Sequence, residues 1–176
     1  MRYMMTVEHL QQRLWSEPGF RPWVVLDGAG VPGLTTRLSA LPEHCWTCLF
    51  HGHLEPDVAE LAPYLLEVPR QGAMLDWLLS GWGHHWGVYL LAPDSIGPAL
   101  LRRHLRKLGV AYGPAGEALW FRWYDPRVLG MAAPGLDAVQ LQALFGPVRR
   151  FLLEADEPGQ GMVLEPSGSG LAAGRF

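Results

Sequence analysis

The 176-residue sequence has few charged residues. They make up 18% of the chain, whereas a soluble domain carries about 25%. Fourteen basic and seventeen acidic residues give a formal net charge of −3, so there is no electrostatic case for binding nucleic acid or an anionic membrane. We therefore expect neither of them as a partner.

Cysteines and long apolar runs are scarce as well. Residues 1–14 contain charged side chains and no apolar run, so we expect neither a signal peptide nor a membrane anchor. This predicts a cytoplasmic protein. Its two cysteines, Cys45 and Cys48, are then expected to be reduced.

Apolar residues and tryptophans are plentiful. Apolar residues form 49% of the chain, enough for a substantial core, and we expect one domain over residues 1–153 followed by a Gly/Pro/Ser-rich tail over residues 154–176. Eight tryptophans beside so few charges indicate either a Trp-rich core or an apolar surface that a partner covers.

Short apolar runs alternate with segments of helical periodicity. The predicted strands are 23–26, 45–50, 64–68, 86–91 and 119–124, with a late edge strand at 162–164, and residues 167–170 are predicted as linker. The predicted helices are 3–14, 55–61, 74–79, a helix capped by Asp94 or Ser95 that stops at Gly109, and 137–152 with a kink or break at Gly146–Pro147. This alternation predicts an α/β fold, with a mixed, mostly parallel central sheet flanked by helices and a helical C-terminal part.

A glycine-rich segment follows the first predicted strand. Residues 28–33 (GAGVPG), from Gly28 to Gly33, match the G-x-G-x-x-G pattern of dinucleotide-binding turns. However, Pro32 interrupts the turn, the following helix is short, and His51 stands where an acidic residue should end the next strand. These departures favour an ordinary turn over a dinucleotide site.

Two groups of histidines and cysteines resemble sites without completing one. Cys45, Cys48, His51 and His53 have zinc-ligand chemistry, but the two cysteines would point to opposite faces of a strand. The His84–His85 pair has no nucleophile or carboxylate that the sequence places beside it. We therefore expect no metal, no cofactor and no catalytic residue.

Basic residues cluster in the predicted helix that stops at Gly109. The cluster consists of Arg102, Arg103, Arg106 and Lys107. Cations near a helix C-terminus complement the helix dipole, so a solvated face is favoured over a phosphate site.

The most informative segment is the run Phe121, Arg122, Trp123, Tyr124, Asp125, Pro126 and Arg127. It predicts the end of a strand at Pro126, with Asp125 held by the arginines on either side in a bidentate ion pair. An aspartate held in this way is a fixed anion rather than a proton donor, so a structural role is favoured over a catalytic one.

These residues carry a resemblance to a known family. Residues 25–29 (VLDGA), 61–65 (LAPYL), 104–105 (HL), 121–129 (FRWYDPRVL), 140–141 (QL) and 145–147 (FGP) occur in order. The sequence thereby resembles the type VI secretion effector chaperones built on domain of unknown function 4123. The resemblance implies a non-enzymatic adaptor that binds a toxin effector, at the effector's N-terminal or spike-proximal region, and helps to load it onto the trimeric VgrG-type spike protein.

The resemblance assigns its motif residues to the fold. These are Asp27, Gly28, Arg122, Asp125, Pro126 and Arg127. For the partner-binding surface we predict the aromatic and arginine residues Trp82, Trp86, Trp120, Arg122 and Tyr124. The alternatives are a relative that binds only the spike, or a small dinucleotide-binding or metal-dependent enzyme that uses residues 28–33 or the Cys45, Cys48, His51 and His53 set.

Overall fold

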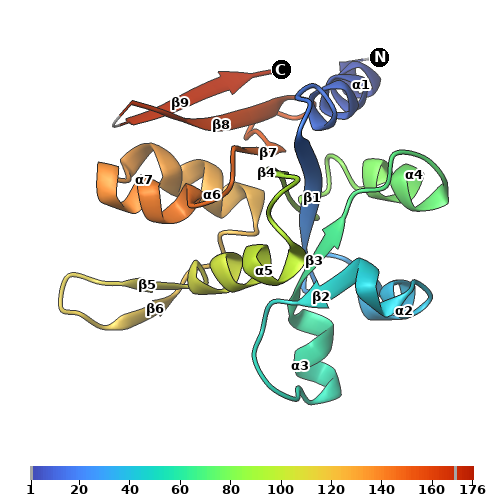
Figure 1. Ribbon diagram of the computed structural model, residues 1–176, viewed down its shortest axis with the longest axis horizontal. Coiled ribbons are helices and arrows are strands. Elements are labelled where there is room, and N and C mark those ends of the chain that lie inside the picture. Colours follow the sequence, from blue (N-terminus) through green and yellow to red (C-terminus); the bar gives the residue numbers. More distant parts are fainter. Residues whose placement is uncertain (1, 169) are drawn as a thin grey trace.

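The computed structural model of the chain describes residues 2–168 and 170–176, with side chains from residue 6 onward. Three parts of the sequence predictions lie outside this description. They are Met1 in the N-terminal segment, the side chain of Tyr3 in the first predicted helix, and Ser169 in the predicted linker. Within the described residues, seven strands form one sheet in the order β2-β3-β1-β4-β7-β8-β9, and β5 and β6 form a separate hairpin (Figure 1).

The elements have the following bounds. The strands of the main sheet are β1 (Phe20–Asp27), β2 (Trp46–Cys48), β3 (Pro63–Glu67), β4 (Gly87–Pro93), β7 (Arg150–Glu154), β8 (Gly161–Ser167) and β9 (Gly170–Arg175), and the hairpin is β5 (Val110–Tyr112) with β6 (Ala118–Trp120). The helices are α1 (Arg2–Leu14), α2 (Leu34–Ser39), α3 (Pro56–Leu61), α4 (Ala73–Ser80), α5 (Pro98–Lys107), α6 (Pro126–Ala132) and α7 (Ala138–Phe145), with short 3₁₀ turns η1 (Glu43–Cys45) and η2 (Ala133–Gly135).

The prediction of a mostly parallel sheet is wrong. Every strand pair in the described part of the chain is antiparallel. Strands β1 and β2 do run in the same direction, as do β3 and β4, and a helix-containing segment joins each pair. However, β3 lies between β1 and β2, and β1 lies between β3 and β4. Periodicity predicts which segments are strands, but not which strands become neighbours.

The two faces of the sheet bury separate apolar clusters. Successive residues of a strand point to opposite faces. Val25 of β1 and Phe151 of β7 therefore pack with α5, α6 and α7, whereas Val24 and Leu152 pack with α1, α2 and α4. Figure 1 shows these two sets of helices on opposite sides of the sheet.

The predicted strand 119–124 ends early. Strand β6 stops at Trp120, and Asp125 is the N-cap of α6, where its carboxylate accepts a hydrogen bond from the Arg127 amide. Proline fits the first helical position, so Pro126 begins a helix there. Trp123 and Tyr124 are both buried in the turn before α6, edge to face, with ring centroids 6.1 Å apart.

The predicted C-terminal helix 137–152 is helical only as far as Phe145, and the rest of the C-terminal part is sheet. The predicted capping box of Asp137 and Gln140 is confirmed, but α7 ends at Phe145 because Gly146 adopts a positive φ of 46° and Pro147 cannot donate to a helical carbonyl. The chain closes with β7, β8 and β9. The strand predicted at 162–164 lies within β8, but β9 covers its edge. Among the described residues, no helix is long and apolar enough to cross a membrane.

Candidate functional site

Three buried acidic residues lie at one end of the central strands. Asp27 ends β1, Glu154 ends β7, and Asp125 caps α6. Buried carboxylates need hydrogen-bonding or charged partners, and two arginines and a histidine supply them here. We refer to Asp27, His85, Arg122, Asp125, Arg127 and Glu154 together as the ionic cluster.

The two arginines of the 121–127 segment take different partners. Arg127 holds Asp125 with two parallel hydrogen bonds, Nε to Oδ1 at 3.0 Å and Nη2 to Oδ2 at 2.7 Å. Arg122 instead donates to Asp27 at the end of β1. Burial raises the pKa of Asp125, but the hydrogen bonds and charge of Arg127 outweigh it and hold that pKa below its ordinary value. Asp125 is therefore a fixed anion, held by Arg127 at the start of α6, and only one of the two arginines predicted to hold it does so.

His85 and Glu154 form the other contact of the ionic cluster. The His85 amide donates to Oε1 of Glu154 at 2.9 Å, and its Nδ1 lies 3.1 Å from Oε2 without hydrogen-bond geometry. Burial raises the pKa of Glu154 to about 7, although the His85 amide acts in the opposite direction. Burial and the charge of Arg127 lower the pKa of His85. Glu154 therefore changes its charge close to neutral pH, where His85 is mainly neutral.

The glycine-rich turn is explained by backbone packing. A Cβ atom on Gly28 would lie 2.4 Å from the carbonyl oxygen of Glu60 and 2.5 Å from that of Ala62, and the Gly28 amide donates to the latter at 3.1 Å. The space that a pyrophosphate would need at Gly28 is therefore filled by the chain itself. Gly33, with a φ of 67°, begins α2, which has only six residues.

The cysteine and histidine set does not converge on one point. In the part of the chain that the structure describes, no group of three or more His, Cys, Asp or Glu side chains is arranged to hold a metal ion. Both cysteines are free thiols, and burial raises the pKa of Cys48. The His51 ring lies 3.3 Å from an Arg106 nitrogen, so its neighbour is a cation rather than a metal ligand.

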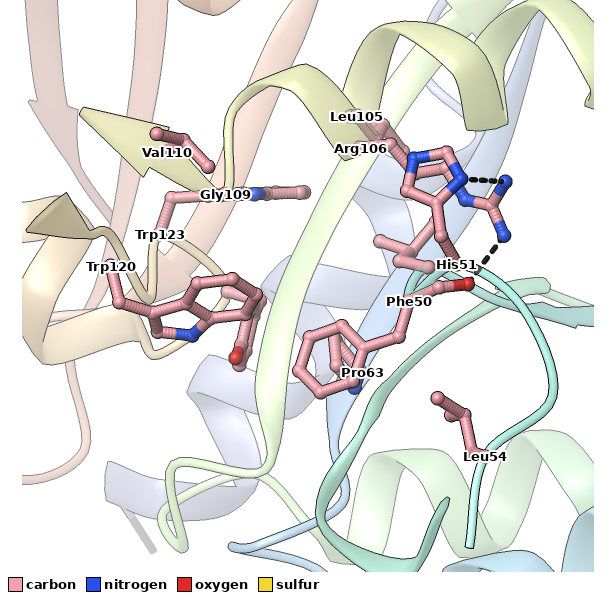
Figure 2. Close-up of a pocket in the computed structure, with 12 residues that line it drawn as sticks. Phe50, His51, Leu54, Pro63, Leu105, Arg106, Gly109, Val110, Trp120 and Trp123 are labelled. Carbon is pink, nitrogen blue, oxygen red and sulfur yellow. Dashed lines mark hydrogen bonds between the residues drawn. The ribbon is translucent and has the colours of Figure 1, made fainter. Parts of the chain in front are cut away.

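An apolar pocket of about 420 Å³ lies between the β5–β6 hairpin, α5 and the loop after β2. Figure 2 shows Phe50 and Trp120 facing one another across it, with Leu54 and Pro63 on the same wall as Phe50 and Arg106 with His51 at one side. The Phe50 and Trp120 rings meet edge to face, with centroids 5.2 Å apart. Trp123 and Tyr124, from the resemblance motif, line the pocket as well.

The hairpin beside this pocket exposes large apolar side chains. Tyr112 is 75% exposed, Trp120 60%, Leu119 48% and Val110 40%. A two-stranded hairpin gains little stability in water on its own, and large exposed apolar surfaces mark interaction sites. In Figure 1 the hairpin extends away from the sheet beyond the end of α5.

The structure separates the residues predicted to bind a partner. Trp120 and Tyr124 lie together at the pocket, and Arg122 is nearby in sequence but points to Asp27 in the ionic cluster. Trp82 and Trp86 lie in the cluster on the opposite face of the sheet. Trp82 is buried there against the Phe176 ring, and Trp86 is partly buried against Trp77.

Sequence reasoning missed Phe50 and the His85–Glu154 contact. Phe50 lies just after a strand that ends at Cys48, and its partner Trp120 is seventy residues away, so no local pattern joins them. The contact with Glu154 depends on the pairing of β4 with β7. A buried strand that ends in an acidic residue, as both β1 and β7 do, is the feature of the sequence that could have indicated the ionic cluster.

Comparison with known proteins gives one family. The family described as "Domain of unknown function (DUF4123)" matches residues 22–143. This span from β1 to α7 includes the ionic cluster except Glu154 and all of the residues given above as lining the pocket. No protein of curated function and no solved structure matches the chain.

Proposed function

The chain belongs to the DUF4123 family, and from this premise we propose that it is an adaptor of the type VI secretion system that binds a toxin effector and promotes its loading onto the VgrG-type spike protein. In this proposal the chain performs no catalysis. It acts by binding polypeptide, in the cytoplasm of the producing cell, before the effector leaves.

The observation that carries the proposal is the apolar pocket with its exposed hairpin. Trp120 lines the pocket while more than half exposed, and its ring lies edge to face with that of Phe50. A large aromatic side chain at a concave apolar site is the kind of anchor that dominates the affinity of protein interfaces. Tyr124 at the base of the pocket is buried and would shape the pocket.

The ionic cluster supports the proposed binding role through the elements that it holds together. Asp27 is paired with Arg122, and Asp125 is held by Arg127, which lowers the pKa of the Asp125 carboxyl. The contacts of the cluster tie Arg122, in the segment before α6, to the end of β1, and tie His85, before β4, to the end of β7. The segment before α6 also carries the pocket residues Trp123 and Tyr124. We propose that the cluster fixes the position of this wall.

The test is co-purification with the cognate toxin effector, which this proposal expects to be encoded beside the gene. We expect the tagged full-length chain to retain that effector, and Trp120→Ala to weaken binding by at least about tenfold, because truncating an anchor costs about 2 kcal/mol or more. Met131→Ala is the matched control, since Met131 is also an exposed apolar residue but lies on α6 away from the pocket lining.

Two results would count against the proposal in different ways. If the wild-type chain retains neither the effector nor the spike protein, the adaptor role fails. If it retains the effector and Trp120→Ala binds as well as Met131→Ala, the role stands and the pocket is the wrong surface.

A further inference from the structure

A row of cations lies directly beside the apolar pocket. Helix α5 contributes Arg102, Arg103, Arg106 and Lys107 to the lining of a hollow of about 410 Å³, which His51 lines as well. In the described part of the chain, none of these four side chains takes part in an ion pair with an acidic residue. The row is therefore uncompensated, although the chain as a whole has a net charge of −3.

Two of these arginines are fixed in place by the backbone. Arg102 Nε and Arg106 Nη2 each donate to the Cys48 carbonyl at 3.2 Å, and Arg106 Nη2 also donates to the Phe50 carbonyl. Burial, and then the charge of Arg102, lowers the pKa of Arg106. The positive charges of Arg102 and Arg106 repel each other, and an anion bound beside them would offset this repulsion.

The row and the pocket are continuous. Arg106 and His51 line both the apolar pocket and the cationic hollow, and Figure 2 shows their side chains at the side of the pocket, with Phe50 close to Arg106. A ligand seated on Trp120 and Phe50 would therefore pass onto α5 within a few residues. There it would meet Arg103 and Lys107, which are exposed and available to it.

We infer that the occupant of this surface is a polypeptide segment in which apolar side chains, seated in the pocket, are followed directly by aspartate or glutamate residues that contact α5. This inference rests on the proposed function and names the chemistry of the effector segment. Carboxylates match guanidinium groups geometrically, and the concave apolar pocket fits a side chain better than a flat bilayer or a phosphate backbone. Complementary charges at the rim of an interface mainly raise the association rate and set specificity.

The test uses the full chain with the effector encoded beside its gene, and measures affinity between ~0.05 and ~0.5 M salt. Arg103→Glu with Lys107→Glu should weaken binding about tenfold or more at low salt and remove much of the salt dependence. Arg70→Glu is the matched control, since Arg70 is an exposed arginine outside both the pocket and the cationic hollow.

The outcomes separate this inference from the adaptor role. If Trp120→Ala weakens binding while the α5 double variant equals Arg70→Glu, the adaptor role stands and the acidic segment is refuted. A photo-crosslinking residue at Leu119, read by mass spectrometry, gives an independent answer. We expect the attached effector peptide to contain Asp or Glu beside apolar residues. A peptide without carboxylates, or one from a second copy of this chain, would overturn the inference.

Discussion

The charge state of Glu154 gives the fold a specific pH dependence. Its pKa is raised by burial from 4.5 to about 7, so the folded chain holds a proton that the unfolded chain releases between these values. The stability that this residue contributes is present below pH 4.5 and is lost as the pH rises through about 7, by about 3 kcal/mol in total.

Glu154→Gln should remove this loss of stability. The amide keeps an oxygen to accept from the His85 amide and cannot ionise, so the variant should exceed the wild-type chain in unfolding free energy at pH 8 and approach it at pH 5. Urea denaturation across this range measures the effect, with Glu8→Gln on the exposed side of α1 as control. Parallel curves for the wild-type chain and Glu154→Gln would contradict the assigned ionisation.

The Arg122–Asp27 pair is expected to matter more than a surface ion pair. Asp27 is buried, whereas Arg122 is 44% exposed, so Arg122→Ala leaves a buried anion without its cation at a cost of about 1–3 kcal/mol. Arg21→Ala, which breaks the exposed pair with Glu67, should cost less than about 1 kcal/mol. Denaturant midpoints of the two variants compare them directly. Equal losses would mean that Asp27 finds another partner.

At the scale of single elements, the turn after β1 depends on the missing side chain of Gly28. Gly28→Ala would place a Cβ atom against two carbonyl oxygens of the α3–β3 connection, and overpacking against backbone should destabilise the fold by about 1–3 kcal/mol. Gly135→Ala, where the space is open, should be close to neutral. Thermal unfolding checks both. A neutral Gly28→Ala would show that residues 60–62 can move away.

The ends of several helices could be predicted from the sequence because glycines and capping residues close to each end determine them. Gly81 ends α4, Gly109 follows α5, and the Asp137–Gln140 capping box begins α7, as predicted. The prediction for α5 went wrong only at its start, where Gly97 rather than Asp94 or Ser95 is the N-cap, because Pro98 fixes the first helical position.

Ambiguous spacing explains the larger errors. Val148 and Leu152 are four residues apart, which fits the buried face of a helix. Both are indeed buried, but Val148 lies in the turn after Gly146 and Leu152 lies in strand β7. Helix α6 was not predicted because an Asp-Pro pair is compatible both with the end of a strand and with the start of a helix. The candidate pocket could be predicted only as far as its Trp120 and Tyr124 wall, since Phe50 reaches it through tertiary packing.

At the scale of the whole molecule, β8 and β9 complete the sheet. Strand β8 pairs with β7, Leu164 of β8 is fully buried in the first apolar cluster, and Phe176 stacks on Trp82 in the second. A chain that ends after Pro158 would uncover one edge of β7 and parts of both clusters.

We expect this truncated chain to aggregate or unfold, because an exposed apolar strand edge pairs with other chains. Size-exclusion chromatography and circular dichroism would show it beside the full chain. A monomeric, cooperatively unfolding product would instead support residues 1–153 as a self-sufficient unit. The same measurement on a full chain with a substitution at Ser167, the last residue of β8, controls for changes at the C-terminal end alone.

The strand order has a further consequence for how the chain acquires its shape. The central strand β1 pairs with β3 and β4, which are synthesised some forty and seventy residues later. Strand β4 in turn pairs with β7, which lies near residue 150. On the ribosome, β1 thus emerges long before either neighbour exists. Such distant pairings slow the search for the native state, so the nascent chain spends much of its synthesis with an unsatisfied strand.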